Sequence, residues 1–209
     1  MMRHWGGGGS ILKFKDAGNE IYWLNVTDVK AEYGWERSFV EKRRIQINQA
    51  KEYYGFHEFI NLQFPPAQLD DRNKSMLIEA IGGIFDRVKP DCIILPDYND
   101  AHSDHKYVFE AACACSKTFR RGYIKRILTM EIASETNFGK PDGLFHPNLY
   151  IDISDYMDRK LEALRIYDTE LGELPFPRSA EAVKSQAVVR GIEAGALYAE
   201  AFRVIKEIE

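Results

Sequence analysis

The chain has 209 residues, of which 45% are hydrophobic and 29% are charged, and its net charge at neutral pH is −4. This composition predicts a single globular domain over residues 1–209 and disfavours nucleic acid binding, which usually requires a basic surface. No apolar stretch approaches the roughly 20 residues of a membrane-spanning helix, no secretory signal is visible, and three cysteines cannot form a disulfide framework, so we expect a cytoplasmic protein without a membrane span.

Hydrophobic periodicity and Gly or Pro stop signals predict strands that alternate with helices. We expect strands at residues 20–28, 57–62, 91–96, 124–132 and 148–154. Helices are expected at residues 36–54, 72–89, 104–119, 154–168 and, as a long last element, 178–207. This alternation favours the α/β class, with a mostly parallel sheet and helices on both of its faces. Ligands of such sheets bind beyond the carboxyl ends of the strands.

The stretch GGGGS near the start of the chain allows two interpretations. It resembles a flexible linker, including one introduced for protein expression. It also runs directly into ILKFKDAG, which has a helix-like pattern, and glycines before a helix allow a close approach of the backbone. We favour the second interpretation, in which the glycines are native to the fold.

The stretch DAHSDH begins three residues after the apolar strand CIILP ends and contains two His and two Asp. Imidazole and carboxylate groups are good zinc ligands, and His also acts as an acid or base near neutral pH. Ser103 or Asp104 could instead serve only to cap the next helix. A cap needs one Ser or Asp and not two His as well. We therefore favour a functional site that includes Asp100, His102, Asp104 and His105.

Four stretches of the sequence occur in the order that is found in a known enzyme family. The first is VKPDCIILPDYNDAHSDHKYV, an apolar strand followed by His-x-Asp-His and a helix. The other three are GGGGSILKFKDAGNEIYWLNVTD, ERSFVEKRRIQINQAKEYYGF and LFHPNLYIDISDYMDRKLEALRIYDTEL. Together they cover most of the chain from Gly6 onward, and the chain resembles the PIG-L/LmbE-like family of zinc-dependent N-deacetylases.

This resemblance implies a Rossmann-like three-layer sandwich and hydrolysis of the acetamido group of an amino sugar, with Zn²⁺ as cofactor. In such enzymes the last His of His-x-Asp-His binds zinc, which here is His105. The first His, here His102, stabilises the tetrahedral intermediate or acts as a general acid, and the Asp between them, here Asp104, orients it. The chemistry is consistent, because zinc can activate water and stabilise an oxyanion while a His protonates the leaving amine.

One signature of that family has no match in this sequence. The family carries His-Pro-Asp-Asp-Glu at the end of its first strand, where it supplies two zinc ligands and the general base. Matching the glycines places the Asp pair at Met1 and Met2, so the first strand is expected to be absent. His4 lies too close to the glycines to be the family's His. Loss of a strand from the middle of a sheet would expose the edges of its two neighbours.

The missing signature leaves three hypotheses open. The chain could be an incomplete product of a normal deacetylase, or a variant that has lost catalysis and serves as a binding protein. It could also recruit His4, Asp28 or Asp100 as replacement ligands. Asp28 closes the strand YWLNVTD and could either face the cleft or cap a turn.

Substrate contacts are predicted from residues near the expected strand ends. Glu131 could contact a sugar hydroxyl, although it could also be a solvated loop carboxylate. Tyr98 and Trp35 could stack on a sugar ring, although aromatic side chains on such loops often only pack. His146 precedes Pro147 in a loop that could border the cleft.

The sequence therefore predicts a zinc-dependent N-deacetylase that acts on a small N-acetylated amino sugar or its conjugate. The alternative is a catalytically inactive or truncated family member that acts as a sugar- or partner-binding protein. The identity of the sugar and its carrier cannot be predicted from the sequence, and the oligomeric state is open, a homo-oligomer included.

Overall fold

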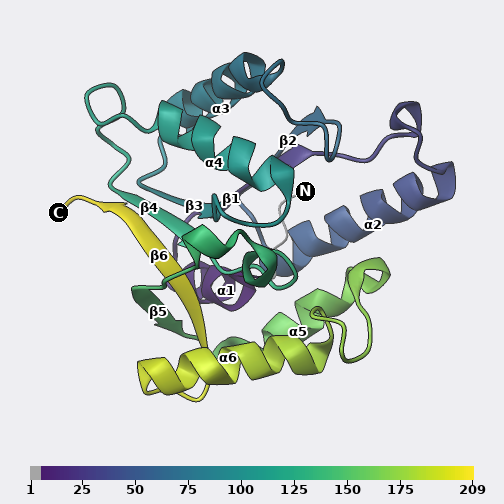
Figure 1. The fold of residues 1–209 in the computed structure, drawn as a ribbon, viewed down its shortest axis with the longest axis vertical. Helices are drawn as coiled ribbons and strands as arrows, with labels where there is room; N and C mark the ends of the chain where they lie inside the picture. The colour runs from purple at the N-terminus through teal and green to yellow at the C-terminus, as the bar shows by residue number, and fades with distance from the viewer. Residues whose placement is uncertain (1–5) are drawn as a thin grey trace. The chain divides into compact units, whose positions relative to one another are not determined.

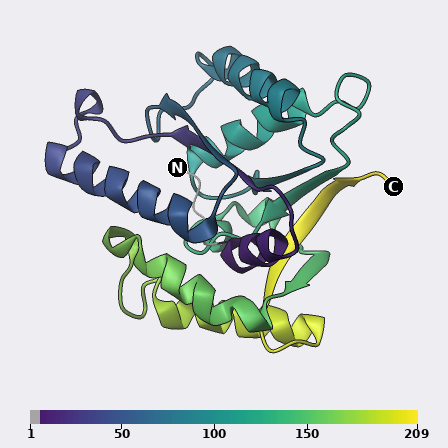
Figure 2. The same ribbon diagram turned by 180° about the vertical axis from the view of Figure 1, so that it is seen from behind.

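The computed structural model describes residues 6–209, and Figure 1 and Figure 2 show its ribbon from opposite sides. The chain divides into two compact units. The first unit runs to Pro65 and includes Tyr150–Glu200, and the second comprises Pro66–Leu149 and Ala201–Glu209. The single domain over residues 1–209 stays a prediction.

The first unit combines two parallel strands with four helices. The strands are β1 (Tyr22–Thr27) and β2 (Glu58–Phe64), and the helices are α1 (Gly8–Asp16), α2 (Arg37–Tyr54), α5 (Met157–Arg165) and α6 (Ala180–Ala194). Helices α5 and α6 lie side by side (Figure 1). The core of the unit includes the buried side chains of Trp23, Ala50, Ile153, Met157, Leu164, Tyr167, Val183 and Ala187.

The second unit contains helices α3 (Lys74–Val88) and α4 (Ser103–Cys115), which lie side by side, and strands β3 (Cys92–Pro96) and β4 (Arg126–Met130). Strands β5 (Leu149–Asp152) and β6 (Ala199–Glu207) complete a sheet of order β3-β4-β6-β5. Strands β3 and β4 are parallel, whereas β4 and β6 are antiparallel. Short 3₁₀ helices lie at Ala31–Tyr33, Thr136–Phe138, Pro141–Gly143, Ser154–Tyr156 and Asp168–Glu170.

The long C-terminal helix predicted for residues 178–207 is wrong. Helix α6 ends at Ala194 because Gly195 adopts a left-handed backbone with φ of 70°, which glycine tolerates at no steric cost. The chain then folds back over Gly191, where an added Cβ would lie 2.6 Å from the Ala196 carbonyl oxygen. The next element is strand β6 rather than more helix. The α/β class is confirmed, but the mostly parallel Rossmann-like sheet is not, because the described strands form two sheets and the larger one is mixed.

The expectation of an absent first strand depended on Met1, Met2 and His4, which lie outside the described residues. Within residues 6–209, helix α1 precedes the first strand. Its glycines are buried, and a Cβ on Gly9 would lie 2.9 Å from the Ile153 side chain. Such a contact is too short for any larger residue. The GGGGS stretch is therefore part of the packed fold, as the second interpretation predicted.

The N-terminus of α1 is capped by a carboxylate from a distant part of the chain. Glu200, at the start of β6, accepts hydrogen bonds from the backbone N–H groups of Gly9 (2.9 Å) and Ser10 (2.7 Å). The Lys160 ammonium of α5 lies 2.7 Å from the same carboxylate, and both side chains are buried. Helix N-termini carry unpaired N–H groups and a partial positive charge. A buried carboxylate accepts hydrogen bonds from these N–H groups and also balances the positive charge.

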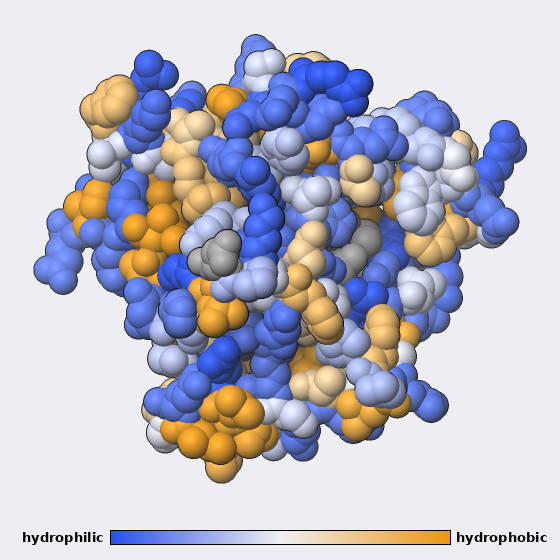
Figure 3. Space-filling view, viewed as in Figure 1, coloured by the Kyte–Doolittle hydropathy of each residue, from blue (hydrophilic) through white to orange (hydrophobic). Residues whose placement is uncertain are grey.

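The face of the molecule that Figure 3 draws is mainly polar. Within residues 6–209, no helix combines the length and the apolar character needed to cross a membrane. Figure 3 shows a largely hydrophilic face that is interrupted by separate apolar patches. Helix α6 contributes exposed apolar side chains to the surface, among them Val189 and Ile192. Scattered exposed apolar residues of this kind are normal on folded proteins.

Candidate functional site

The candidate site begins where β3 ends and α4 starts, in the second unit. His102 is the N-cap of α4, with extended backbone angles, and its Nδ1 accepts the backbone N–H of Asp104 at 3.2 Å. Asp104 lies in the first turn, where a carboxylate complements the helix dipole. The stretch DAHSDH therefore does start a helix. An imidazole, rather than the Ser or Asp expected for this role, provides the cap.

His105 is paired with a buried carboxylate. Its Nδ1 lies 2.8 Å from Oδ2 of Asp100, and both side chains are almost completely buried. The hydroxyl of Thr136 donates to the other oxygen of Asp100 at 2.7 Å. Burial raises the pKa of Asp100 to about 7, against the opposing effect of the Thr136 hydrogen bond. A carboxylate behind an imidazole fixes the ring orientation, which is the usual arrangement around a metal-binding His.

The second imidazole lies beside the first. The rings of His102 and His105 are stacked with their centroids 5.0 Å apart. Burial lowers the pKa of His102, and the neighbouring His105 lowers it further. Because Nδ1 of His102 accepts a hydrogen bond, the neutral ring carries its proton on Nε2. His102 is thus set up as a hydrogen-bond donor, which suits the stabilisation of an oxyanion better than it suits proton donation.

Asp104 makes contacts that the sequence did not indicate. Its carboxylate accepts the backbone N–H groups of Ala67 (2.7 Å) and Leu69 (3.2 Å), and the side chain is buried. The contact with His102 comes from the Asp104 backbone and not from the carboxylate. The orienting role predicted for this carboxylate is therefore replaced, in this structure, by anchorage of the loop that follows β2.

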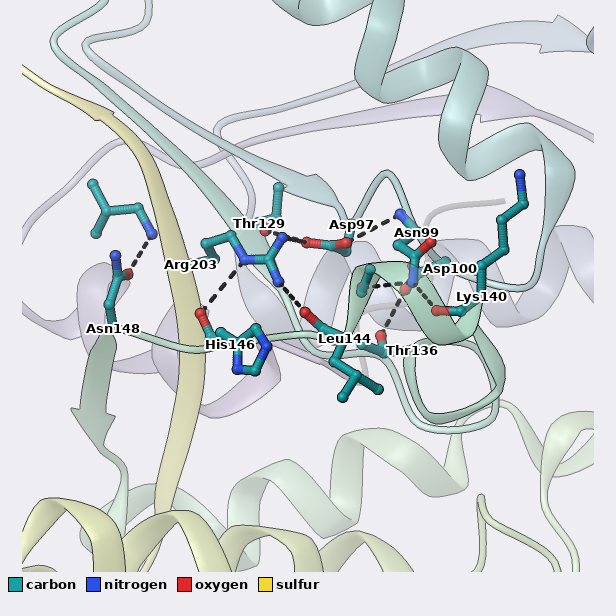
Figure 4. Close-up of polar contacts among 12 residues, drawn as sticks. Asp97, Asn99, Asp100, Thr129, Thr136, Lys140, Leu144, His146, Asn148 and Arg203 are labelled. Carbon is teal, nitrogen blue, oxygen red and sulfur yellow. Dashed lines mark hydrogen bonds and ion pairs between the residues drawn. The ribbon is translucent and has the colours of Figure 1, made fainter.

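A neighbouring network was not predicted from the sequence. Asp97, the first residue after β3, is fully buried and accepts the Thr129 hydroxyl at 2.8 Å. The guanidinium of Arg203, from β6, lies 3.6 Å from the same carboxylate and donates to the Leu144 carbonyl at 2.7 Å (Figure 4). The position of Asp97 at a strand end could have indicated it. Arg203 could not have been found, because the sequence predicted a helix there.

The predicted substrate-binding residues have mixed outcomes. Tyr98 is exposed, with its ring 5.3 Å from that of Phe109. Glu131 is buried just after β4, so the alternative of a solvated carboxylate is wrong. His146 is exposed, and its carbonyl lies close to Arg203 (Figure 4).

Two further candidates belong to the first unit. Asp28 accepts the backbone N–H of Val29 at 2.8 Å and the side-chain amide of Asn61 at 2.6 Å, so it performs the turn-capping role that the sequence left open. Trp35 is exposed and its ring stacks on that of Phe39, with the centroids 5.1 Å apart. Neither the hydrogen bonds of Asp28 nor the stacking of Trp35 on Phe39 indicates a bound ligand.

The described donor groups fit one zinc ligand and not a complete zinc site. A catalytic zinc usually has three protein ligands. Among residues 6–209, no group of three or more His, Cys, Asp or Glu side chains is placed to hold a metal ion. His105 with Asp100 behind it has the form of one such ligand. We therefore derive no chemical step through a metal from these residues.

Comparison with known proteins identifies the family. A family model described as PIG-L, GlcNAc-PI de-N-acetylase, matches residues 3–116, which contain both His102 and His105. The chain belongs to the PIG-L family. The resemblance that was inferred from the four sequence stretches is thereby confirmed.

The chain is similar to a deacetylase in sequence and to solved structures that include a deacetylase and a hydratase. Diacetylchitobiose deacetylase of Thermococcus kodakarensis is 23% identical over 230 residues, which cover 96% of this chain and 78% of that protein. The solved structure of N,N′-diacetylchitobiose deacetylase from Pyrococcus horikoshii has a TM-score of 0.73 and 20% identity, and covers 97% of this chain and 79% of that one. GalB, the 4-carboxy-2-hydroxymuconate hydratase of Pseudomonas putida KT2440, has a TM-score of 0.71 and 16% identity over 98% and 92% of the two chains. At this identity the structural similarities show the fold alone.

Proposed function

We propose that this PIG-L protein is an N-deacetylase that hydrolyses the acetamido group of an amino sugar or its conjugate and uses zinc. The observation that carries the proposal is the buried His105–Asp100 pair beside His102, at the carboxyl end of β3. This pair lies within the family match. The deacetylase names of two relatives support the choice of reaction.

The chain's own residues have separate roles in this proposal. The Asp100 carboxylate is hydrogen-bonded to Nδ1 of His105, so a metal would be held by Nε2 of the same ring. His102 directs its N–H toward the developing oxyanion of the acetamido group, where a pre-oriented donor lowers the barrier. Asp104 holds the loop at Ala67 and Leu69. When bound, zinc would supply an activated water and charge stabilisation.

A second candidate function is supported by the incomplete donor set. Since no group of three ligands is found among residues 6–209, a family member that binds an amino sugar without hydrolysing it is also consistent with the site. The two functions differ in one observable, which is the release of acetate.

Acetate release from N,N′-diacetylchitobiose tests the proposal. The protein is stripped with EDTA, dialysed and assayed with and without added zinc. We expect zinc to restore turnover, and His105→Ala to lower kcat/KM by about a hundredfold or more, because a metal contributes several kcal/mol to the transition state. His57→Ala is the matched control, since His57 is an exposed imidazole outside the site, and it should retain full turnover.

Two results would decide against the deacetylase. Sugar binding without any acetate release, at saturating zinc, would favour the binding protein. Full turnover by His105→Ala would show that the reaction does not depend on the assigned site.

A further inference from the structure

The loop between α4 and β4 is strongly basic. Residues 117–126, up to the first residue of β4, read KTFRRGYIKR and contain five of the chain's 28 Lys and Arg residues; we call them the basic loop. None of the 32 Asp and Glu residues lies between Glu110 and Glu131. The whole chain has a net charge of −4, so the positive charge is local. A cluster of one sign in a chain of the opposite sign indicates a surface for a charged partner.

Arg121 fixes the basic loop to helices α3 and α4. Its guanidinium makes two hydrogen bonds of 2.7 Å to the Asp86 carboxylate in α3. It also donates to the carbonyls of Gly82 (3.2 Å) and Cys115 (2.9 Å). The Tyr123 hydroxyl donates to the same Asp86 carboxylate at 3.1 Å. These contacts give Arg121 a structural role and hold the backbone of the loop.

Three other cations of the basic loop are not used by the fold in this way. Lys117, Arg120 and Lys125 are exposed, and within residues 6–209 no carboxylate forms an ion pair with any of them. Arg126 differs, because it pairs with Glu207. The three unpaired cations are therefore available to an anionic surface.

An aromatic side chain lies among these cations. Phe119 is 79% exposed, the highest value among the large hydrophobic side chains of residues 6–209. The guanidinium of Arg120 lies 5.6 Å from its ring centroid. Figure 1 and Figure 2 both show the loop between α4 and β4 projecting from the second unit. An exposed aromatic ring flanked by Lys and Arg is typical of segments that lie in the interface of an anionic membrane.

We propose that the basic loop is a docking surface for an anionic lipid membrane. Phe119 inserts among the lipid head groups, and Lys117, Arg120 and Lys125 lie against the lipid phosphates. A projecting loop fits a flat surface of this kind. Single-stranded nucleic acid instead binds in a groove that follows its backbone, and a DNA duplex is read by a helix or ribbon that enters its groove. Three cations and one ring give reversible, peripheral attachment.

The basic loop and the candidate site lie at opposite ends of the same sheet. Strands β3 and β4 are parallel. The candidate site follows the carboxyl end of β3, whereas the basic loop leads into the amino end of β4. Docking through the loop would therefore leave the candidate site directed away from the membrane. The inference does not depend on the proposed function, and its test requires no turnover.

Co-sedimentation with lipid vesicles tests the docking surface. One set of vesicles contains phosphatidylcholine alone, and the other contains equal amounts of phosphatidylcholine and phosphatidylglycerol. We expect the full chain to bind the anionic vesicles and not the neutral ones, and about 0.5 M NaCl to weaken this binding. Lys117→Gln/Arg120→Gln should lower the partition coefficient about twentyfold, since each cation near an anionic surface contributes about fivefold. Phe119→Ser should lower it about tenfold.

Matched controls remove the same groups from other exposed positions. Arg37→Gln/Lys140→Gln removes the same charge outside the basic loop, and Met76→Ser removes an apolar side chain of α3 that is 61% exposed. Both control variants should bind the anionic vesicles like the unaltered protein.

Three results would overturn the docking surface. The first is an unaltered protein that does not bind the anionic vesicles. The second is an equal loss of binding in the loop variants and the control variants. The third uses a fluorescent single-stranded oligonucleotide: binding of this probe that requires Phe119, without any binding to vesicles, would assign the basic loop to nucleic acid instead.

Discussion

Glu200 in the first unit and Asp100 in the second are both buried carboxylates, but their partners differ. Glu200 faces the Lys160 ammonium and two backbone N–H groups of α1. Asp100 faces an imidazole and a hydroxyl, and burial raises its pKa to about 7. Full compensation of a buried charge is typical of a structural group. Incomplete compensation is typical of a group that acts with a cation, a proton or a ligand. The comparison therefore separates a structural carboxylate from a functional one.

Glu200→Ala should have the largest effect on stability. It leaves the buried Lys160 ammonium unpaired and two N–H groups of α1 without their acceptor. Breaking a buried ion pair on one side costs about 3–5 kcal/mol of unfolding free energy. Urea unfolding followed by circular dichroism measures the loss.

The control for this variant is Glu207→Ala, which removes an exposed carboxylate from the same strand, β6. It should cost less than about 1 kcal/mol. Equal losses from the two variants would break the comparison, because burial and helix capping would then contribute nothing.

Asp100→Asn should act on function rather than on folding. The amide keeps the approximate shape of the carboxylate but cannot support a metal-bound imidazole in the same way. Loss of such a supporting group lowers metal affinity by about 10–100-fold. Competition with a zinc chelator measures the affinity, and urea unfolding should show little loss of stability. A stability loss as large as that of Glu200→Ala would remove the distinction between the two carboxylates.

Asp104→Ala extends the comparison to a third buried carboxylate. Asp104 resembles Glu200, because its carboxylate accepts hydrogen bonds from backbone N–H groups, here those of Ala67 and Leu69. Leaving these donors unpaired should cost about 1–3 kcal/mol. Thermal unfolding measures the change, with Asp71→Ala, an exposed carboxylate, as the control. No change in stability would contradict the anchoring role of the Asp104 carboxylate.

The pH dependence of stability should identify Asp100 directly. Its pKa is raised to about 7 in the folded protein, against about 4 in an unfolded chain. Between these values the unfolded state binds fewer protons, so the stability of the metal-free protein should fall as pH rises from about 4 to about 7. Asp100→Asn should flatten this part of the profile. Melting temperatures at a series of pH values in EDTA measure it, and parallel profiles for the two proteins would contradict the assignment.

Ala67→Gly should have the smallest effect, and a favourable one. Ala67 has a positive φ of 58°, which costs a non-glycine residue about 1 kcal/mol. Glycine relieves this strain but adds freedom to the unfolded chain, so the net gain should be about 0.5 kcal/mol or less. Thermal unfolding measures it. A loss of more than about 1 kcal/mol would contradict the strained, positive φ assigned to Ala67.

Local signals predicted the parts of the fold that local chemistry determines. The helix expected at residues 36–54 is observed at Arg37–Tyr54, because Gly55 takes the left-handed conformation that ends it. The error at residues 178–207 has a different origin. The segment AEAFRVIKE contains Ala, Glu and Lys, which favour helices, but it pairs with β4 as a strand. Tertiary pairing outweighed the local preference.

The candidate site was only partly predictable for the same reason. The sequence indicated His102 and His105 from residue type and position after a strand. It placed Asp100 in the same site and considered it as a replacement ligand, but it did not predict the pairing with His105, because that contact depends on how the strand-to-helix loop turns. Thr136 is 36 residues from Asp100 in sequence, and no periodicity connects them. Contacts of this kind require the folded structure.

Anomalous diffraction at the zinc edge, from crystals grown with zinc, tests the central claim most directly. The claim is that Asp100 orients His105 as the metal-binding group of an amide-hydrolysing site. It predicts a zinc peak about 2.0–2.1 Å from Nε2 of His105, with Nδ1 still bonded to Asp100. A zinc peak at another position would contradict the account. So would a His105 side chain that is rotated away from Asp100 in the presence of zinc.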